Sequence, residues 1–310
     1  MIMEFRHIPV LLDECIRGLN IKPDGIYVDG TAGGAGHSSE IAKRLTTGRL
    51  IAIDRDPDAV KIAAERLYGF NARVVHDHFC NVAGILKTLD IDKIDGMLLD
   101  LGVSSYQLDN EERGFSYHAD AELDMRMSRE GLSAKDVVNS YSYSELVRIL
   151  FEYGEEKFAK SIAANIVKAR EARPIESTLE LGDIIRQSIP QRFRREKNPC
   201  KKTFQAIRIE VNNELTELSE TLDTAFDLLN KGGRLAVITF HSLEDRLVKQ
   251  RFAGFATGCT CPPEFPVCVC GKTPKGRLVT RKPIEPSEAE LAGNNRSHSA
   301  KLRIIEKIKD

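Results

Sequence analysis

The sequence predicts an α/β fold, in which helices cover both faces of a mostly parallel sheet and a helical segment interrupts the chain. Three observations predict this fold. Short apolar runs alternate with amphipathic helical patterns up to about residue 100. Between about Ser104 and about Phe204 only helical patterns occur, and strand patterns then return. The early strands are almost continuously apolar, which is typical of parallel strands that are buried on both faces.

Each expected element of the first part follows from its own pattern. Pro57 stands at a first-turn position, where a helix does not need its N–H, and apolar residues at helical spacing follow it. The expected helices are 36–45, 57–70 and 82–89, and the expected strands are 25–30, 49–56, 72–79 and 94–102.

The middle of the chain is predicted to be helical. Ser142 with Glu145, and Ser177 with Glu180, each fit a capping box at the start of a helix. These helices are expected at 144–172 and 177–189, and a third around 215–226 leads into strands at 230–240 and 300–308. The predicted division is an α/β domain in two parts, 1–105 and 212–310, around a helical insertion at 106–211.

The composition is that of a globular chain. Of its 310 residues 42% are hydrophobic and 29% are charged, with a net charge of −1, so any nucleic-acid surface must be a local basic patch. No apolar run reaches the roughly 20 residues of a membrane span, and the N-terminal segment lacks the pattern of a secretory signal. We therefore expect a cytoplasmic protein with no membrane partner. The seven cysteines are consistent with a reducing compartment, because they do not resemble the disulfide framework of a secreted protein.

A loop of small residues links the first expected strand to a helix, in "VDGTAGGAGHSSEIAKRL" at 28–45. A P-loop requires G-x-x-x-x-G-K-[ST], but His37 follows Gly36 where lysine would stand. A dinucleotide loop requires G-x-G-x-x-G, but Ser39 occupies the position of the third glycine. The loop therefore matches neither of these phosphate sites.

The residues around this loop favour a different ligand. Gly33, Gly34 and Gly36 allow close approach of the backbone to a ligand, and the N–H groups that begin the next helix can bind polar atoms. Asp54 ends the second strand, where it can bind ribose hydroxyls, and Asp29 suits a cationic, amino-acid-like group better than a pyrophosphate. S-adenosylmethionine has both features. An ordinary tight turn with a solvated aspartate is the alternative.

Small and polar residues also follow the fourth strand, in "MLLDLGVSSYQLDNEERGFSY" at 97–117. Ligands of open α/β sheets bind beyond the carboxyl ends of the strands, so we expect Asp100 and Gln107 to reach the cofactor or the target. Ser104 and Ser105 can cap a helix or line the pocket. A polar surface loop is the alternative for each of them alone.

The sequence resembles the bacterial 16S rRNA (cytosine-N4)-methyltransferase family, also called RsmH or MraW. The resemblance rests on words that span almost the whole chain in order: "HIPVLLDE", "VDGTAGGAGHS", "AIDRDPDA", "DLGVSSYQLD", "RGFS", "LDMRM", "TFQAIRIEVNNEL", "GGRLAVITFHSLEDRLVK" and "NNRSHSAKLR". The chain departs from the family at Tyr106 and Asn295, where proline is usual, and at His298. The resemblance implies a class I S-adenosylmethionine-dependent methyltransferase fold, Rossmann-like, with an inserted helical domain. It also implies an enzyme that methylates the exocyclic N4 amine of a cytidine in the decoding region of 16S rRNA.

The same resemblance implies a set of contacts to S-adenosylmethionine. The loop would hold the methionine end, Asp54 the ribose, and Phe79 would stack near the adenine. A conjugated amine needs an acceptor that localises its lone pair before it can attack a methyl group, so Asp100 is the candidate catalytic residue. The implied cofactor contacts are Ala35, Gly36, His37, Asp54, Phe79, Asp100 and Gln107.

A basic stretch at 186–208 is the candidate RNA surface. It carries eight lysines and arginines against the single acid Glu196, with Phe193 and Phe204 between them. A base stacked inside a helix cannot reach a methyl donor, so the target must be unpaired or flipped out. A solvated helix end is the alternative, and His241 fits a structural role equally well. The candidate RNA contacts are Arg194, Arg195, Lys201, Lys202, His241, Ser242 and Arg296.

Four cysteines crowd into "GCTCPPEFPVCVCG". Four close thiolates can hold zinc in a tetrahedron. Zinc sites usually contain C-x-x-C, however, because two intervening residues turn the chain around the metal, whereas this segment has C-x-C twice. Zinc and two local disulfides stay open, and we expect free thiols with no metal at Cys259, Cys261, Cys268 and Cys270.

Two other functions stay open from the sequence. An oxidoreductase can use the same sheet, although the mismatched dinucleotide loop counts against it. A non-catalytic ribosome-assembly factor can bind the same cofactor only for stability.

Overall fold

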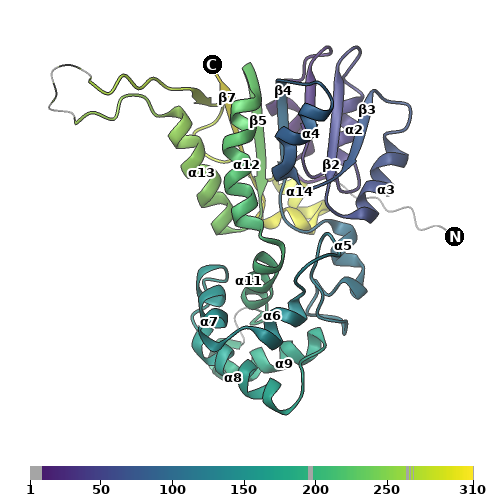
Figure 1. The fold of residues 1–310 in the computed structure, drawn as a ribbon, viewed down its shortest axis with the longest axis vertical. Coiled ribbons are helices and arrows are strands. Elements are labelled where there is room, and N and C mark those ends of the chain that lie inside the picture. Colours follow the sequence, from purple (N-terminus) through teal and green to yellow (C-terminus); the bar gives the residue numbers. More distant parts are fainter. Residues whose placement is uncertain (1–8, 195–197, 263–264, 266, 268, 310) are drawn as a thin grey trace. The chain divides into compact units, whose positions relative to one another are not determined.

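A computed structural model describes residues 9–194, 198–262, 265, 267 and 269–309 (Figure 1). The chain divides into two compact units. The first, the sheet unit, combines Met1–Gly102 with Thr216–Asp310, and the second, the helical unit, is Val103–Leu215.

The sheet unit is built on one sheet of seven strands in the order β3-β2-β1-β4-β5-β7-β6. The five strands from β3 to β5 in this order run parallel, and β7 is antiparallel to both of its neighbours. The predicted mostly parallel sheet is therefore confirmed. The strands are β1 (Ile26–Asp29), β2 (Arg49–Asp54), β3 (Ala72–His76), β4 (Ile94–Asp100), β5 (Leu229–Thr239), β6 (Gly276–Leu278) and β7 (Lys301–Lys307).

Both faces of the sheet carry a buried core, which explains why its central strands are apolar throughout. Successive side chains of a strand point to opposite faces. Ile51 and Met97 accordingly belong to one core, and their chain neighbours Leu50 and Leu98 belong to the other. All four side chains are fully buried.

The helices of the sheet unit belong to these two cores. Residues of α1 and α2 join the core that contains Leu98, and residues of α4, α12 and α13 join the core that contains Met97. Asp56 caps α3 by accepting the N–H of Asp58, and Pro57 occupies the first turn as predicted. The sequence analysis did not predict α1 or α13. The helices are α1 (Leu12–Leu19), α2 (Gly36–Ala42), α3 (Pro57–Arg66), α4 (Val82–Thr88), α12 (Glu214–Leu228), α13 (Ser242–Ala256) and α14 (Glu288–Gly293).

The helical unit has a core of its own, to which Leu146, Ile162, Leu181 and Ile207 contribute fully or almost fully buried side chains from four helices. Apart from one isolated bridge between Glu122 and Ser177, its described residues form helices, turns and loops. The helices are α5 (Ser105–Asp109), α6 (Ala134–Ser140), α7 (Tyr143–Glu152), α8 (Ala159–Ala172), α9 (Thr178–Ser188), α10 (Gln191–Arg194) and α11 (Lys201–Asn212).

The single helix expected at 144–172 is two helices, α7 and α8. A Cβ on Gly154 would lie 2.7 Å from the carbonyl oxygen of Leu150 and 2.9 Å from that of Lys202, so the chain passes too close to other backbone for a larger residue there. Glu155 follows with a left-handed φ of 47°. The break therefore lies at a glycine that is needed both for a local contact, with Leu150, and for a contact with α11 that the local pattern does not contain.

The two predicted capping boxes differ. At α7 the box is complete, because Ser142 accepts the N–H of Glu145 while the Glu145 carboxylate accepts the N–H of Ser142. At α9 Ser177 accepts the N–H of Glu180, but the Glu180 carboxylate accepts the N–H of Glu176. Among the described residues, every helix is too short or too polar to pass through a lipid bilayer.

Candidate active site

Three aspartates lie at the carboxyl ends of three adjacent parallel strands, all on the same side of the sheet. Asp29 ends β1, Asp54 ends β2 and Asp100 ends β4, and β1 lies between the other two strands. The strand order reverses between β1 and β4, and open α/β sheets bind their ligands at such a switch point. We call Asp29, Asp54 and Asp100 the acidic edge.

The loop after β1 is held by hydrogen bonds to the strands and to the acidic edge. Thr31 N donates to Asp29 Oδ1 at 3.1 Å, and Gly33 N donates to Asp54 Oδ2 at 2.7 Å. Asp29 Oδ2 also accepts the Ser38 hydroxyl at 2.5 Å. Three further loop N–H groups, those of Gly30, Ala32 and Ala35, donate to the carbonyl oxygens of Leu98, Ile53 and Ala32.

These hydrogen bonds determine whether the loop favours an anionic or a cationic ligand. Phosphate loops offer backbone N–H groups to an anion, whereas five N–H groups of this loop are already donated to the protein itself. Two of their acceptors are carboxylates, whose negative charge repels a phosphate. The arrangement therefore favours a cationic ligand, in agreement with the mismatch to both phosphate motifs.

The glycines of the loop have different roles. Gly33 has a left-handed φ of +50°, which only glycine adopts at little cost. A Cβ on Gly34 would lie 3.4 Å from the mobile end of Arg66, which is ordinary contact. A Cβ on Gly36 would lie 2.3 Å from Pro9 Cγ, so Gly36 makes room for Pro9. We expected all three glycines to give a ligand room. At Gly36 this is not so, because Pro9 occupies the space beside its Cα atom.

His37 connects the N-terminal segment to the acidic edge. Its Nε2 lies 3.0 Å from the carbonyl oxygen of Val10, so the proton belongs on Nε2. Its Nδ1 lies 3.7 Å from Asp100 Oδ2. Ala35 precedes it as the N-cap of α2, fully buried and with a left-handed φ of 58°. His37 and Ala35 thus fix the start of α2 beside Asp100.

Asp100 is the least compensated carboxyl group of the site. Its Oδ1 is buried and has no hydrogen-bond partner within the described part of the chain. Burial, and then the negative charges of Asp29 and Glu244, raise the pKa of Asp100 to about 8. Burial likewise raises the pKa of Asp29 to about 6, against the opposing hydrogen bonds from Ser38 and Thr31. Near neutral pH the edge therefore holds at least one proton, or else a cation.

The residues after β5 complete this side of the site. His241 is the N-cap of α13 and accepts the N–H of Glu244 at Nδ1, while its Nε2 lies 3.1 Å from Glu244 Oε1. The Glu244 carboxylate also accepts the N–H of Phe240 at 2.8 Å. Asp245 pairs with Arg303 through both of its oxygens. His241 therefore caps α13 through Nδ1, while its buried Nε2 has no hydrogen-bond partner among the described residues.

Comparison with known proteins decides the family. The model of the MraW methylase family matches residues 4–308.

The chain belongs to the MraW methylase family.

Curated relatives cover almost the same length. The protein called "Ribosomal RNA small subunit methyltransferase H" from Lachnospira eligens is 59% identical, over 99% of this chain and 99% of its own. Its namesake from Clostridium botulinum strain Kyoto is 58% identical, over 99% of this chain and all of its own. A solved structure, a putative rRNA-methylase from Clostridium thermocellum, is 13% identical with a TM-score of 0.46, over 97% of this chain and 100% of that one, a likeness too weak to bear on the site. The methylase is an enzyme with the predicted class I, Rossmann-like fold.

Phe79, the expected adenine contact, lies beyond β3 in a short 3-10 helix, Phe79–Asn81. It is buried in the core that contains Met97, and the Arg55 guanidinium lies 5.8 Å from its ring centroid. Arg55 and His78 both contact Glu217 of α12, at 3.4 and 2.9 Å. The sequence analysis missed Glu217, because nothing in a helical pattern marks one glutamate as a partner of a distant strand.

Thr31 is a second residue that the sequence analysis missed. Its hydroxyl oxygen accepts the N–H of Asp100 at 2.6 Å, so it joins the loop after β1 to the end of β4. Its place directly after "VDG" at a strand end is the signal that was available.

In the helical unit, Gln107 caps α5. Its side-chain oxygen accepts the N–H of Ser104 at 2.9 Å, and its N–H donates to Ser104 Oγ, which makes a complete capping box. Gln107 is 4% exposed. Ser104 therefore has the capping role that the sequence left open.

The predicted basic stretch of the methylase is less free than its sequence suggests. Arg208 pairs with Glu214 through Nε and Nη2, at 2.8 and 2.9 Å, and Arg186 pairs with Asp183 at 2.7 Å. The prediction that Glu196 is the only acid opposing the basic side chains is therefore wrong for these two arginines. Each of them pairs with an acidic residue outside the stretch 186–208.

The two aromatic residues of the stretch also differ. Phe204 is buried in the helical core, whereas Phe193 is 43% exposed. Lys202 donates to the carbonyl oxygen of Glu155 at 2.7 Å, and Lys201 is exposed. Arg195 and the side chain of Arg194 lie outside the described residues.

The remaining RNA candidates lie in the sheet unit. Ser242 is an exposed first residue of α13. Arg296 is exposed on a 3-10 helix, Asn295–Ser299.

The contact between Gly36 and Pro9 predicts a loss of stability in Gly36→Ala. The added methyl group must displace Pro9, and overpacking of this kind typically costs about 1–3 kcal/mol. Urea denaturation measures the change. Gly34→Ala is the matched control, and it should alter the free energy of unfolding by less than about 1 kcal/mol. Equal effects of the two substitutions would contradict the packing role of Gly36.

The raised pKa of Asp100 predicts a pH-dependent gain in stability for Asp100→Asn. The unfolded chain ionises Asp100 above about pH 4, whereas the folded chain retains the proton up to about pH 8. Between these values the folded state binds more protons, so the free energy of unfolding of the unsubstituted protein falls as pH rises. Relative to it, Asp100→Asn should gain at least about 1.4 kcal/mol between pH 5 and pH 9, the equivalent of one pKa unit.

Glu40→Gln is the control for this series. Hydrogen bonds from Lys43 and Arg44 lower the pKa of Glu40, so it is ionised throughout this range and the effect of its substitution should not change with pH. An effect of Asp100→Asn that is equally flat would contradict the buried, protonated state of Asp100.

Proposed function

We propose that the chain transfers the methyl group of S-adenosylmethionine to the N4 amine of a cytidine in the decoding region of 16S rRNA, within the small ribosomal subunit. The observation that carries this proposal is the buried, unpartnered Oδ1 of Asp100 at the switch point of a class I sheet. The relatives named ribosomal RNA small subunit methyltransferase H support the rRNA part of it. The reaction belongs to the cytoplasm, where ribosomes are assembled.

The charge of the acidic edge fits the proposed cofactor. S-adenosylmethionine supplies, when bound, an electrophilic methyl group on a positively charged sulfur, and its amino-acid end carries an ammonium group. Opposite charge nearby favours ionised carboxylates, so a bound cation offsets the burial that raises the pKa of Asp29 and Asp100. An anionic cofactor would add to the repulsion.

The proposed cofactor contacts act in different ways. Both oxygens of Asp54 already accept a backbone N–H, from Gly33 and Asp56, and each oxygen retains a lone pair for a ribose hydroxyl. Phe79 offers an apolar ring surface after β3. Ala35, Gly36 and His37 act through the backbone position that they fix, and Gln107 remains a proposed contact from the helical unit.

Asp100 is proposed to prepare the cytosine amine. The lone pair of this amine is delocalised into the ring, so an acceptor that binds one amine hydrogen makes the nitrogen a better nucleophile. Methylation forms the N–C bond and breaks the S–C bond, and the nitrogen then loses a proton. Asp100 Oδ1 can take this proton once the bound cation has ionised the Asp100 carboxyl group, because this buried oxygen has no other hydrogen-bond partner among the described residues.

The RNA must present its cytidine unstacked, as for other enzymes that act on a base. Lys201 and Lys202 of the helical unit, and Arg296 and Ser242 of the sheet unit, are the described candidates for phosphate contacts. Arg194 and Arg195 remain candidates from the sequence alone. His241 is proposed to support the site by fixing the start of α13, because its Nδ1 accepts the N–H of Glu244.

Methyl transfer to small subunits tests the proposed function. Labelled S-adenosylmethionine and subunits that lack the modification should yield label in N4-methylcytidine, identified by chromatography of the digested rRNA. Asp100→Asn should lower kcat by about 10²- to 10⁴-fold, the usual contribution of an acid–base group. Asp95→Asn, which lies on the same strand near its opposite end, is the control and should keep most of the activity.

Two results would count against the proposal. Absence of label in every cytidine would reject the reaction, leaving a non-catalytic assembly factor or an oxidoreductase to be tested by cofactor binding. Label in cytidine with an undiminished Asp100→Asn rate would reject the role of Asp100 alone.

A second prediction concerns the ribose contact. Asp54→Ala should weaken binding of S-adenosylmethionine at least tenfold, because a hydrogen bond to a charged group contributes about 1.5–3 kcal/mol. Isothermal calorimetry measures the affinity, and Asp58→Ala, on the first turn of α3, is the control. The free energy of unfolding should be measured alongside, because Asp54 also holds Gly33. Unchanged affinity in Asp54→Ala would refute the assignment.

A further inference from the structure

The segment 257–275, which we call the cysteine loop, joins α13 to β6 in the sequence, and its described residues extend away from α13 (Figure 1). Lys275 N donates to the carbonyl oxygen of Phe255 at 2.9 Å, which closes the base of the loop. Beyond this base the described apolar side chains are exposed, with Val267 at 70% and Val269 at 73%. The loop therefore lacks hydrophobic burial at these positions, and other interactions must order it.

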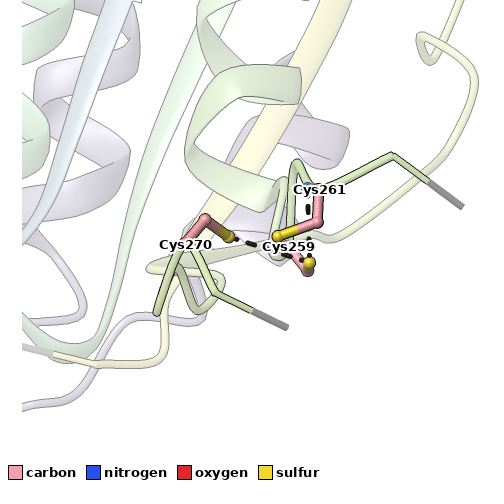
Figure 2. A group of neighbouring side chains, drawn as sticks. All are labelled: Cys259, Cys261 and Cys270. Atoms are coloured by element: carbon pink, nitrogen blue, oxygen red, sulfur yellow. Dashed lines mark hydrogen bonds between the residues drawn. The ribbon is translucent and has the colours of Figure 1, made fainter. Parts of the chain in front are cut away.

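Three thiols from the two arms of the loop converge (Figure 2). The sulfur atoms of Cys259, Cys261 and Cys270 all lie within 4.8 Å of one another. Cys270 Sγ lies 3.7 Å from Cys259 Sγ. Zinc–sulfur bonds are about 2.3 Å long, so two sulfurs of one tetrahedral zinc site are separated by about 3.8 Å. The spacing of the thiols is that of a shared metal ion.

The backbone around these thiols is arranged for sulfur acceptors. Cys261 N donates to Cys259 Sγ at 3.4 Å, Val269 N donates to Cys261 Sγ at 3.3 Å, and Thr260 N donates to Cys270 Sγ at 3.4 Å. Each sulfur thus receives at least one N–H, and hydrogen bonds to the charged form of a group favour that form.

We propose that Cys259, Cys261 and Cys270 bind one zinc ion. Thiolates are the ligands of structural zinc, and three of them bind the ion with one position left for a fourth ligand. Cys268, two residues before Cys270 in the sequence, is a candidate for the fourth ligand. It lies outside the described residues, so the proposal rests on the other three cysteines. This proposal differs from the expectation of free thiols, which was based on the unusual C-x-C spacing. The three sulfurs come together from the two arms of the loop. Their arrangement therefore does not require the chain turn that C-x-x-C provides within one pair of cysteines.

The bound ion would order the loop by cross-linking its arms. Cys259 and Cys261 lie on the arm that leaves α13, and Cys270 lies on the arm that returns to β6. A metal site rarely exists in a disordered chain, so the free energy of binding the metal is spent on ordering the segment that carries the ligands. This role is independent of the proposed methyl transfer.

Metal analysis of the full-length, untagged protein tests the proposal. Protein made in zinc-supplied medium and purified without oxygen or chelators should contain one zinc per chain by mass spectrometry of the metals. The triple variant Cys259→Ser, Cys261→Ser, Cys270→Ser should lose at least nine tenths of this zinc. Its thermal unfolding should stay close to that of the unsubstituted protein, because the cores of the two units do not include these residues.

Cys80→Ser is the matched control. Cys80 forms the other described group that combines a thiol with potential metal ligands, together with His78 and Glu217. The zinc content should be unchanged in this variant. Replacement of zinc by cobalt provides a second readout, since cobalt held by tetrahedral thiolates gives intense visible bands that the triple variant should lack.

Three results would overturn the proposal. Zinc near zero, with all thiols titratable in the unsubstituted protein, would mean free cysteines. An intact mass that is lower by the hydrogens of a disulfide, without metal, would mean a cross-link of oxidised sulfur, which requires an S–S distance of about 2.05 Å. Zinc that persists in the triple variant, or disappears in Cys80→Ser, would place the ion elsewhere.

Discussion

The active site depends on the confinement of carboxylates at one edge of a parallel sheet. The strand order brings Asp29, Asp54 and Asp100 to adjacent strand ends. Two of them hold the loop after β1 by accepting its N–H groups, from Thr31 and Gly33. The same residues therefore shape the loop and set its electric field. A loop built in this way cannot be adapted to a phosphate by a change of one side chain, because its backbone donors are already used.

This confinement opposes stability and supports function at once. Burial raises the pKa of Asp100 and of Asp29, so the ionised site is unfavourable until a cation enters. In the proposed reaction a sulfonium compound provides that cation beside the amine that must later lose a proton. In the proposed mechanism the base and the cation site are one group of atoms, so that binding of the cation offsets part of the cost of burying the carboxylates.

Much of the fold follows from local patterns in the sequence, because buried parallel strands are apolar and their ends are marked by acids. The strands that end at Asp29, Asp54 and Asp100 were predicted for this reason. Features that depend on remote contacts were not. Gly36 is needed because Pro9 packs on it, and Arg208 is neutralised by Glu214 beyond the basic stretch. In both cases the deciding atom lies outside the pattern that was examined along the chain, so spacing alone cannot reveal it.

The resemblance to the family specified the reaction, yet several residues that it linked to the cofactor have a role in the protein's own geometry. The side chain of Gln107 completes a helix cap, Gly36 leaves room for a proline, and Ala35 adopts a left-handed backbone conformation at the start of α2. Such residues can be essential for activity without touching a ligand. Loss of activity on substitution therefore does not by itself identify a contact. The stronger criterion is chemical capacity that the folded chain leaves unused, and by that criterion the buried Oδ1 of Asp100 is the better-founded assignment.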